Sequence, residues 1–153
     1  MTRQRSISLI AHRGNRFGPN VSAENAPEYL AEAMRDGFDC EVDLWSEDGA
    51  LFLGHDYPQY PVDLSWLSSN QRMLWIHCKN SDAVAAMSKT PLHWFFHQND
   101  AYTLTSQGYV WAFPGAPSVG KKGVMLFFGE DDPTSDPGFN SAHAVCGDYV
   151  GTW

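Results

Sequence analysis

Residues 37–45, with the sequence GFDCEVDLW, have the apolar character of a buried strand but carry the acids Asp39, Glu41 and Asp43. Side chains alternate between the two faces of a strand, so the three acids share one face and the apolar residues between them share the other. An unpaired buried carboxylate costs on the order of several kcal/mol, and a fold tolerates such a row only where a cation or water meets it. The stretch therefore predicts a strand that lies between a core and a functional site.

The rest of the chain is typical of a single α/β domain. Its 153 residues are close to the usual size of one domain, and 43% of them are hydrophobic, which is enough for a core. We therefore expect one domain over residues 1–153. Short apolar runs bounded by polar residues, glycine or proline are typical of strands, and they occur at 7–12, 38–45, 73–79, 94–98, 109–113, 124–128 and 142–147.

Helices are predicted between the early strands. Residues 24–37, ENAPEYLAEAMRDG, have apolar side chains at helical spacing, with Ser22 as a possible cap. A second helix follows the third strand, with Ser81 as its N-cap, and residues 63–70 favour a shorter one. This alternation favours parallel strands joined by right-handed crossovers, in either an open sheet or a barrel, while the later connections are too short for helices.

Composition excludes several classes of partner. The longest apolar runs fall far short of the roughly 20 residues that span a bilayer, so we expect no membrane insertion. The N-terminal segment turns polar at His12 and Arg13, too early for a secretory signal, which indicates a cytoplasmic protein. A net charge of −8 should repel nucleic acid. Three cysteines without CxxC spacing are expected to be reduced, buried thiols: Cys40, Cys78 and Cys146.

Polar side chains gather where the predicted strands end. By strand alternation His12 shares a face with Ile10, and His77 and Lys79 share a face with Trp75. Parallel α/β folds place ligand sites at the C-terminal ends of their strands, where the loops leave an open crevice. The sequence therefore predicts one site at that end, formed by His12, Glu41, Asp43, His77 and Lys79.

Residues 11–56 contain HRG, a following EN, G-x-D-x-E-V-D-L, then DG and HD. In this order and spacing they resemble the opening motif of the glycerophosphodiester phosphodiesterase family, and WIHCKN and VCGDYV resemble two later strands of that family more loosely. The resemblance implies a TIM-like barrel. Because a full (β/α)₈ barrel takes about 250 residues, we expect an α/β fold of reduced form, with about seven or eight mostly parallel strands and short or missing late helices.

The resemblance also implies an activity, the metal-dependent hydrolysis of a small, glycerophosphodiester-like phosphodiester. Glu41 and Asp43 would bind one divalent cation, and His12 and His55 would exchange protons during cleavage. This division of roles suits the reaction, which needs neutralised phosphate oxygens, a deprotonated nucleophile and a protonated leaving group. Two further cations would help to neutralise the phosphate, Arg13 and Lys79.

His77 departs from the family pattern, since that strand usually offers a third acidic ligand. We expect His77 to bind the metal. The resemblance implies Mg²⁺ or Ca²⁺, but an imidazole in the ligand set shifts the preference toward Mn²⁺ or Zn²⁺. Four other polar residues are candidates for the pocket: Glu24, Asn25, His97 and Asp148.

Other interpretations remain open for several of these residues. Glu41 and Asp43 suit salt bridges to Arg13 and Lys79, and His55 suits a turn beside Gly54 and Asp56. Three functions other than hydrolysis fit the same motifs, namely a metal- and phosphate-binding barrel with little or no activity, a phospholipase-like lyase that gives a cyclic phosphate, and a structural protein. A thinly covered barrel also favours a homodimer.

Overall fold

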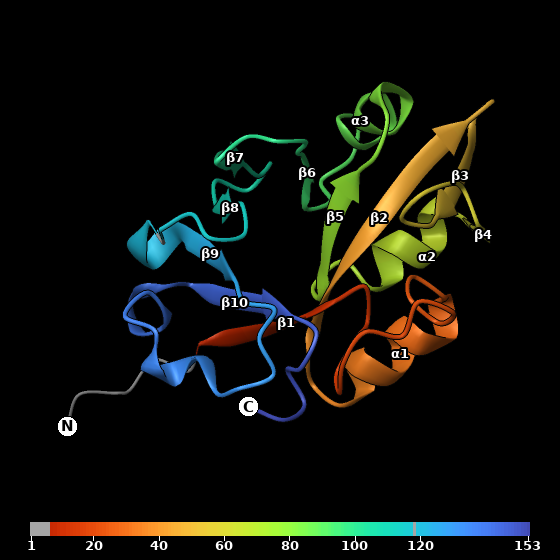
Figure 1. Ribbon diagram of the computed structural model, residues 1–153. Helices are drawn as coiled ribbons and strands as arrows, with labels where there is room; N and C mark the ends of the chain where they lie inside the picture. Colours follow the sequence, from red (N-terminus) through yellow and green to blue (C-terminus); the bar gives the residue numbers. More distant parts are fainter. Residues whose placement is uncertain (1–6, 118) are drawn as a thin grey trace.

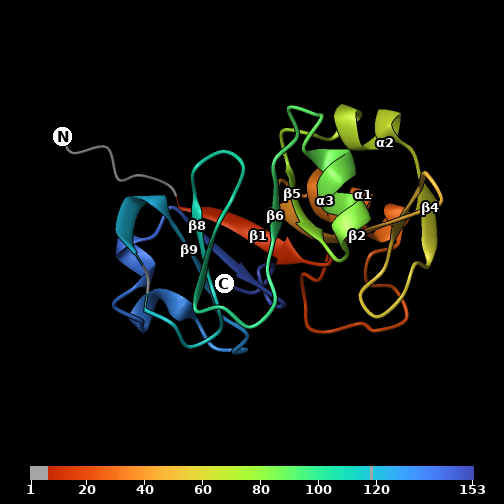
Figure 2. The ribbon, with the colours of Figure 1, turned by 90° about the horizontal axis from the view of Figure 1, so that it is seen from above.

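The computed structural model describes residues 7–117 and 119–153, and its frame is a ten-stranded sheet (Figure 1). The strands are β1 (Ser8–His12), β2 (Asp39–Glu47), β3 (Ala50–Leu53), β4 (Tyr60–Val62), β5 (Leu74–Cys78), β6 (Trp94–Phe96), β7 (Tyr102–Leu104), β8 (Val110–Ala112), β9 (Gly123–Leu126) and β10 (Ala144–Gly147). Their order is β4-β3-β2-β1-β10-β9-β8-β7, and β5 pairs with β2 and β6. Seen from above, the sheet curls around itself as a half-barrel (Figure 2).

The curl is built mainly from parallel pairs. Parallel ladders connect β6, β5, β2, β1, β10, β9 and β8 in succession. The other three strands are antiparallel additions, with β3 and β4 at one end of β2 and β7 beside β8. Asp48 and Gly49 turn β2 into β3, both with positive φ (50° and 80°), which suits the right-handed twist of a tight hairpin.

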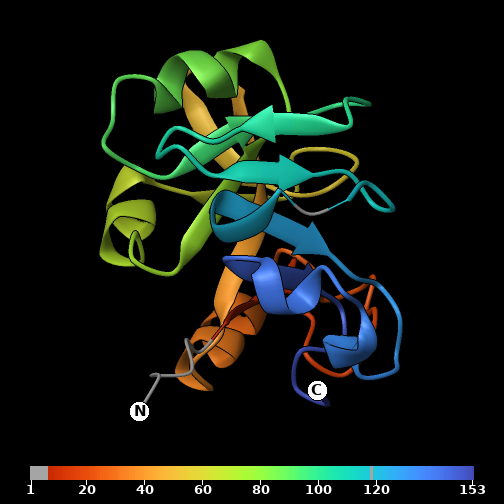
Figure 3. The same ribbon diagram turned by 90° about the vertical axis from the view of Figure 1, so that its left-hand side faces the viewer.

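Three short helices cover only the early strands (Figure 1): α1 (Pro27–Arg35), α2 (Leu64–Ser69) and α3 (Ser81–Met87). They bury Leu30, Leu67 and Met87 against the outer face of β2 and β5. Beyond β6, the helical segments of the described chain are 3₁₀ turns, at Gly120–Lys122, Pro133–Ser135 and Phe139–Ser141. The late strands, which face the viewer in Figure 3, therefore have no α-helical cover within the described residues.

A second apolar cluster fills the inside of the curl. Phe95 of β6 stacks on Trp111 of β8 with 4.5 Å between the ring centroids, which brings the two arms of the curl together. Ile10, Trp75 and Cys146 pack in the same cluster. Because side chains alternate, the next inward positions toward the C-terminal strand ends are His12, His77 and Asp148. The inner core thus leads directly into a polar site.

The expectation of a reduced TIM-like barrel is wrong. The sheet is mixed, it curls as a half-barrel, and three short helices cover one part of it. The physical reason lies in the late connections, since residues 97–101 are too few for a helix and residues 127–143 contain Pro133 and Pro137, which interrupt helices. Among the described helices, none is long and apolar enough to cross a membrane. Cys40, Cys78 and Cys146 are buried free thiols, as expected.

Candidate metal and phosphate site

Strand register brings the predicted site residues together. His12 of β1 lies opposite Glu41 of β2, and Asp43 of β2 lies opposite His77 of β5. His12 and His77 are at or near the C-terminal ends of their strands, whereas Glu41 and Asp43 lie in the first part of the longer β2. Lys79 directly follows β5, and its backbone N–H donates to the Leu44 carbonyl. The parallel pairing predicted from the polar strand ends therefore places these side chains at one edge of the curl.

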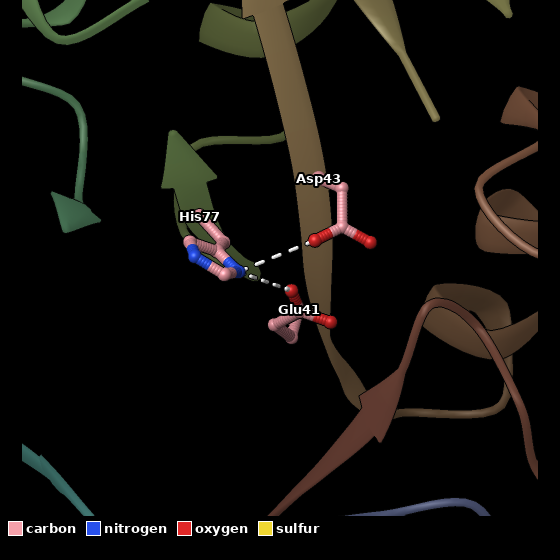
Figure 4. Close-up of side chains that lie close together, drawn as sticks. All are labelled: Glu41, Asp43 and His77. Atoms are coloured by element: carbon pink, nitrogen blue, oxygen red, sulfur yellow. Dashed lines mark ion pairs between the residues drawn. The ribbon is translucent and has the colours of Figure 1, made fainter. Parts of the chain in front are cut away.

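Glu41, Asp43 and His77 form a compact set of potential metal ligands (Figure 4). One ligand atom from each lies within 4.8 Å of the other two. His77 Nδ1 is 3.3 Å from Asp43 Oδ1 and 3.7 Å from Glu41 Oε1. Both acids are almost fully buried, yet within the described part of the chain Glu41 Oε2 and Asp43 Oδ1 accept no hydrogen bond. Buried oxygens without donors are costly, so their arrangement fits a cation between them.

His77 is oriented for this set by its second ring nitrogen. Nε2 lies 2.8 Å from the His97 carbonyl oxygen, which can only accept, so Nε2 carries the proton and Nδ1 faces the acids. The ring also stacks on Phe95. A carbonyl that fixes the tautomer is the usual outer partner of a metal-bound imidazole. Burial disfavours the imidazolium, but Asp43 and Glu41 outweigh it and raise the pKa of His77 to about 9 in the metal-free protein.

Asp43 is held from its other side. Asn25 Nδ2 donates to Asp43 Oδ2 (2.9 Å), and Asn25 Oδ1 accepts from the Asp43 backbone N–H (3.0 Å). Arg13 Nε lies 3.2 Å from Oδ2, and Lys79 Nζ lies 3.9 Å from Oδ1. Burial raises the pKa of Asp43, but His77, Arg13 and Lys79 reverse this and hold it well below its usual range. The carboxylate is therefore ionised and rigid.

The two cations predicted to bind phosphate lie in different situations. Arg13 is engaged with protein acids, since Nη1 donates to Glu24 Oε1 at 3.1 Å while Nε faces Asp43. The Lys79 ammonium lines the cavity, and among the described residues its ion pair is the long contact to Asp43. Arg13 and Asn25 also have left-handed backbone conformations (φ 55° and 66°), which turn both side chains toward β2. Lys79 is thus the cation with more freedom to meet a phosphate.

His12 faces the same acids and is fixed by Asp148. Its Nδ1 lies 2.8 Å from Asp148 Oδ1, which also accepts from Asn15 Nδ2 at 2.9 Å. Nε2 is 3.8 Å from Glu41 Oε2. Burial lowers the pKa of His12, but the hydrogen bond to Asp148 and the charge of Glu41 raise it above its ordinary value. The imidazole therefore has one nitrogen fixed by a carboxylate and the other directed at the site.

A cavity of about 430 Å³ connects these residues. His55 lines it from the loop after β3, with its side chain 41% exposed and Nδ1 2.7 Å from Asp56 Oδ1. His97 lines it too, and neither of its ring nitrogens has a hydrogen-bond partner among residues 7–117 and 119–153. The predicted residues that line the cavity are His12, Arg13, Glu41, Asp43, His55, His77, Lys79 and His97.

The other predicted pocket residues do not line the cavity but contact residues that do. Glu24 and Asn25 hold Arg13 and Asp43, and Asp148 holds His12. Asp39, the third acid of the strand, lies at the opposite end of β2, where its carboxylate accepts from Trp75 Nε1 at 3.0 Å. Sequence reasoning missed Asn15, and no local pattern distinguishes it from the other polar residues of its loop.

Comparisons with protein-family models, curated proteins and solved structures find no match for this chain. The likeness to a known phosphodiesterase family therefore rests on its motif residues alone.

Proposed function

We propose that this protein hydrolyses a small phosphodiester with the help of one divalent cation. The observation that carries the proposal is the buried Glu41–Asp43–His77 set, which offers two carboxylates and an oriented imidazole beside a cavity that also contains His12 and Lys79. Carboxylate and imidazole donors fit Mn²⁺ or Zn²⁺ better than a purely oxygen set does, while Mg²⁺ and Ca²⁺ remain candidates from the resemblance. When bound, the cation would withdraw charge from a phosphate oxygen.

The protein's own groups supply the remaining chemistry. In hydrolysis, water adds to phosphorus, the P–O bond to one alcohol breaks, and the alcohol oxygen takes up a proton. His12 Nε2 can hold or release a proton on the Glu41 side of the cavity, because Asp148 fixes Nδ1. His55 faces the same cavity and is the candidate for the complementary transfer. Lys79 is placed to offset charge on the phosphate.

Metal binding is tested by thermal melts of metal-stripped protein with Mg²⁺, Ca²⁺, Mn²⁺ or Zn²⁺. A ligand that binds only the native state at 100 times its Kd adds about 2.7 kcal/mol of stability. We expect a metal-specific rise in Tm that is lost in Glu41→Gln/Asp43→Asn. Asp39→Asn is the matched control, because it removes an acid from the same strand outside the ligand set and should keep the rise. If no ion raises Tm, the metal site does not exist.

Turnover is tested with bis-p-nitrophenyl phosphate and with glycerophosphodiesters, using the ion that gives the largest rise in Tm. We expect hydrolysis that falls by about a hundredfold or more in His12→Asn, with the rise in Tm retained. Phosphorus NMR of the products distinguishes a phosphate monoester, which hydrolysis gives, from a cyclic phosphate, which a lyase gives. Metal binding without turnover of any phosphodiester would identify a metal- and phosphate-binding protein instead.

A further inference from the structure

The cavity beside the metal-ligand set is lined by charged and polar groups on one side and mainly by apolar groups on the other. Glu41, Asp43, His77 and Lys79 form its polar wall. Its other wall is mainly apolar and comes from β6, the late strands and the loops after them, through Phe96, Trp111, Phe113, Leu126 and Phe128. His97, which packs against Phe113, and Gln98 also line the cavity there. A site for a polyol would need hydrogen-bonding groups on both sides, because hydroxyls placed against phenyl rings lose water without gaining partners. The lining therefore suits a ligand with one charged and one apolar end.

Three phenylalanines of this wall are exposed. Phe96, Phe113 and Phe128 are 39%, 41% and 37% exposed, although each is large and apolar. One exposed phenylalanine is ordinary, but three around one cavity are the kind of apolar cluster that marks a binding surface. Phe128 also lies against His12, with 4.9 Å between ring centroids, so the patch reaches the candidate catalytic groups.

A second cavity, of about 750 Å³, adjoins the apolar wall. Pro114, Leu126 and Phe128 line both cavities. The second cavity is otherwise lined mainly by apolar side chains and glycine, including Met125 and Phe127, and Asp136 is the acidic residue among its described lining. Apolar surface thus continues from the site along β9 and the loop after β8, away from the charged wall.

We propose that the substrate is a phosphodiester in which one ester group is a single hydrocarbon chain. The phosphate lies at the polar wall, and the chain passes Phe113 and Phe128 toward the adjoining cavity. The inference rests on the proposed function and narrows it, since glycerol or another small polyol would leave the phenylalanine wall facing water. The chain is the occupant that the apolar lining shared by the two neighbouring cavities favours, because burying each methylene there is favourable.

The test is a chain-length series measured by binding. Metal-loaded protein is titrated by calorimetry with methyl esters of alkylphosphonic acids, from methyl to octyl, in which the chain is joined to phosphorus by a P–C bond that hydrolysis does not break. We expect Kd to fall by about twofold to fourfold for each added methylene until the chain leaves the wall. The readout is affinity and does not need turnover.

Two variants test whether the dependence of Kd on chain length comes from the apolar wall. Phe113→Ala and Phe128→Ala should flatten the dependence of Kd on chain length while the methyl member binds as before. Phe17→Ala is the matched control, because Phe17 is 66% exposed and lines neither cavity, so it should keep the full dependence. Retention of the metal-induced rise in Tm shows that each variant is folded.

Failure of the inference differs from failure of the proposed function. If all members bind equally well and the metal raises Tm, the site binds phosphate esters but the apolar chain is wrong. If longer chains bind more tightly in wild type and equally so in Phe113→Ala and Phe128→Ala, the chain lies elsewhere and the inference is also wrong. If no member binds and no metal raises Tm, both proposals are wrong.

Discussion

We expect His77 to decide which metal the proposed ligand set prefers. Its Nδ1 faces both acids while the His97 carbonyl holds Nε2, so it contributes a nitrogen donor where two carboxylates alone would favour hard cations. We expect His77→Ala to weaken binding of Mn²⁺ and Zn²⁺ by at least about tenfold. His77→Glu should shift the preference toward Mg²⁺ and Ca²⁺. Calorimetry with the four ions measures both changes, and unchanged affinities and order of preference would remove His77 from the ligand set.

Asp148 positions His12 without lining the cavity. Asp148→Asn keeps the shape of the side chain and an oxygen that can accept from His12 Nδ1 and Asn15 Nδ2, but it removes the negative charge that stabilises the protonated imidazole. We expect kcat to fall at least about tenfold with KM nearly unchanged, as when the orienting acid of a catalytic histidine is neutralised. The metal-induced rise in Tm should persist.

Asp56→Asn is the comparison for this effect. It removes a carboxylate at a similar distance, 2.7 Å, from His55, but Asp56 is exposed, and exposed ion pairs contribute little. We therefore expect a much smaller change in kcat than in Asp148→Asn. Equal losses in the two variants would contradict a special positioning role for Asp148.

His93 should make stability depend on pH. It is buried at the opposite end of the curl, where Nε2 lies 2.8 Å from Thr105 Oγ1, and burial together with nearby His143 lowers its pKa from 6.5 to about 4. Between these values the unfolded chain binds the proton and the folded chain does not, so stability is full above pH 6.5 and is lost as pH falls toward 4.

Urea unfolding of wild type and His93→Gln across this range measures the effect, because glutamine can still contact Thr105 but does not titrate. The free energy of unfolding of wild type should fall faster with decreasing pH than that of the variant. Because the pKa values of His12 and His77 are raised, these residues lower the free energy of unfolding as pH rises above 6.5, the opposite dependence. Both residues are present in wild type and in the variant, so subtracting one curve from the other removes their contribution. Parallel curves would show that His93 titrates normally.

At the scale of elements, Asn80 joins α3 to β2 beside the site. Its Oδ1 caps α3 by accepting from Ala83 N–H (3.0 Å) and also accepts from Ser46 N–H (3.2 Å), while Nδ2 donates to the Ser46 carbonyl (2.9 Å). We expect Asn80→Ala to lower the free energy of unfolding by about 2 kcal/mol, from the lost cap and the unpaired Ser46 groups.

Asn80→Asp separates the two contributions, because it keeps the cap and loses only the donation to Ser46. Its loss in urea unfolding should be clearly smaller than that of Asn80→Ala. A neutral Asn80→Ala would mean that water replaces all three hydrogen bonds and that α3 is not held to β2 through this residue.

The elements that sequence reasoning located are those with local signals. Apolar runs gave the positions of seven strands, β1, β2, β5, β6, β8, β9 and β10, and missed the short β3, β4 and β7. Asp48-Gly49 is a hairpin signal that would have found β3. The helices are present, but their caps differ. Helix α1 begins at Pro27 after Ala26 and not at a Ser22 cap, because proline suits the first turn, and α3 is capped by Asn80 and not by Ser81.

The site shows the same division between local and long-range signals. Strand alternation placed Glu41, Asp43 and His77 on one face, and parallel register then made them neighbours. Arg13 and Asn25, which contact Asp43, both have positive φ values. Their residue types do not predict this backbone conformation, so these contacts could not be predicted from the sequence. The phenylalanine wall was not predicted, because Phe96 ends β6 while Phe113 and Phe128 follow β8 and β9, and the three meet only when the sheet curls.

At the scale of the whole molecule, the expectation of a barrel was wrong because a closed barrel needs an outer layer of helices as well as enough strands. A parallel strand must bury both faces, and helices usually supply the outer layer. Here α1, α2 and α3 cover β1, β2 and β5, while the late strands have 3₁₀ turns and the antiparallel β7. The inner contact of Phe95 with Trp111 brings the arms together without completing a ladder between β6 and β8.

This uneven helical cover raises the question of whether the half-barrel unfolds as one unit. The rates at which its three buried cysteines react with a thiol reagent can answer it. Cys40 and Cys78 lie on β2 and β5 next to the metal ligands, and Cys146 lies on β10 inside the curl. Burial raises the pKa of all three thiols, to about 12 for Cys78. We therefore expect no reaction with a thiol reagent in the native state, and labelling only through opening.

A bound metal should slow that labelling by the same factor at every cysteine that opens together with its ligands. At 100 times Kd the factor is about a hundredfold. The inner cluster spans both arms of the curl, so we expect equal slowing at Cys40, Cys78 and Cys146, followed by mass spectrometry of the labelled peptides. Glu41→Gln/Asp43→Asn, which should bind no metal, is the control and should show no slowing. Slowing confined to Cys40 and Cys78 would mean that β10 opens separately from the strands that hold the ligands.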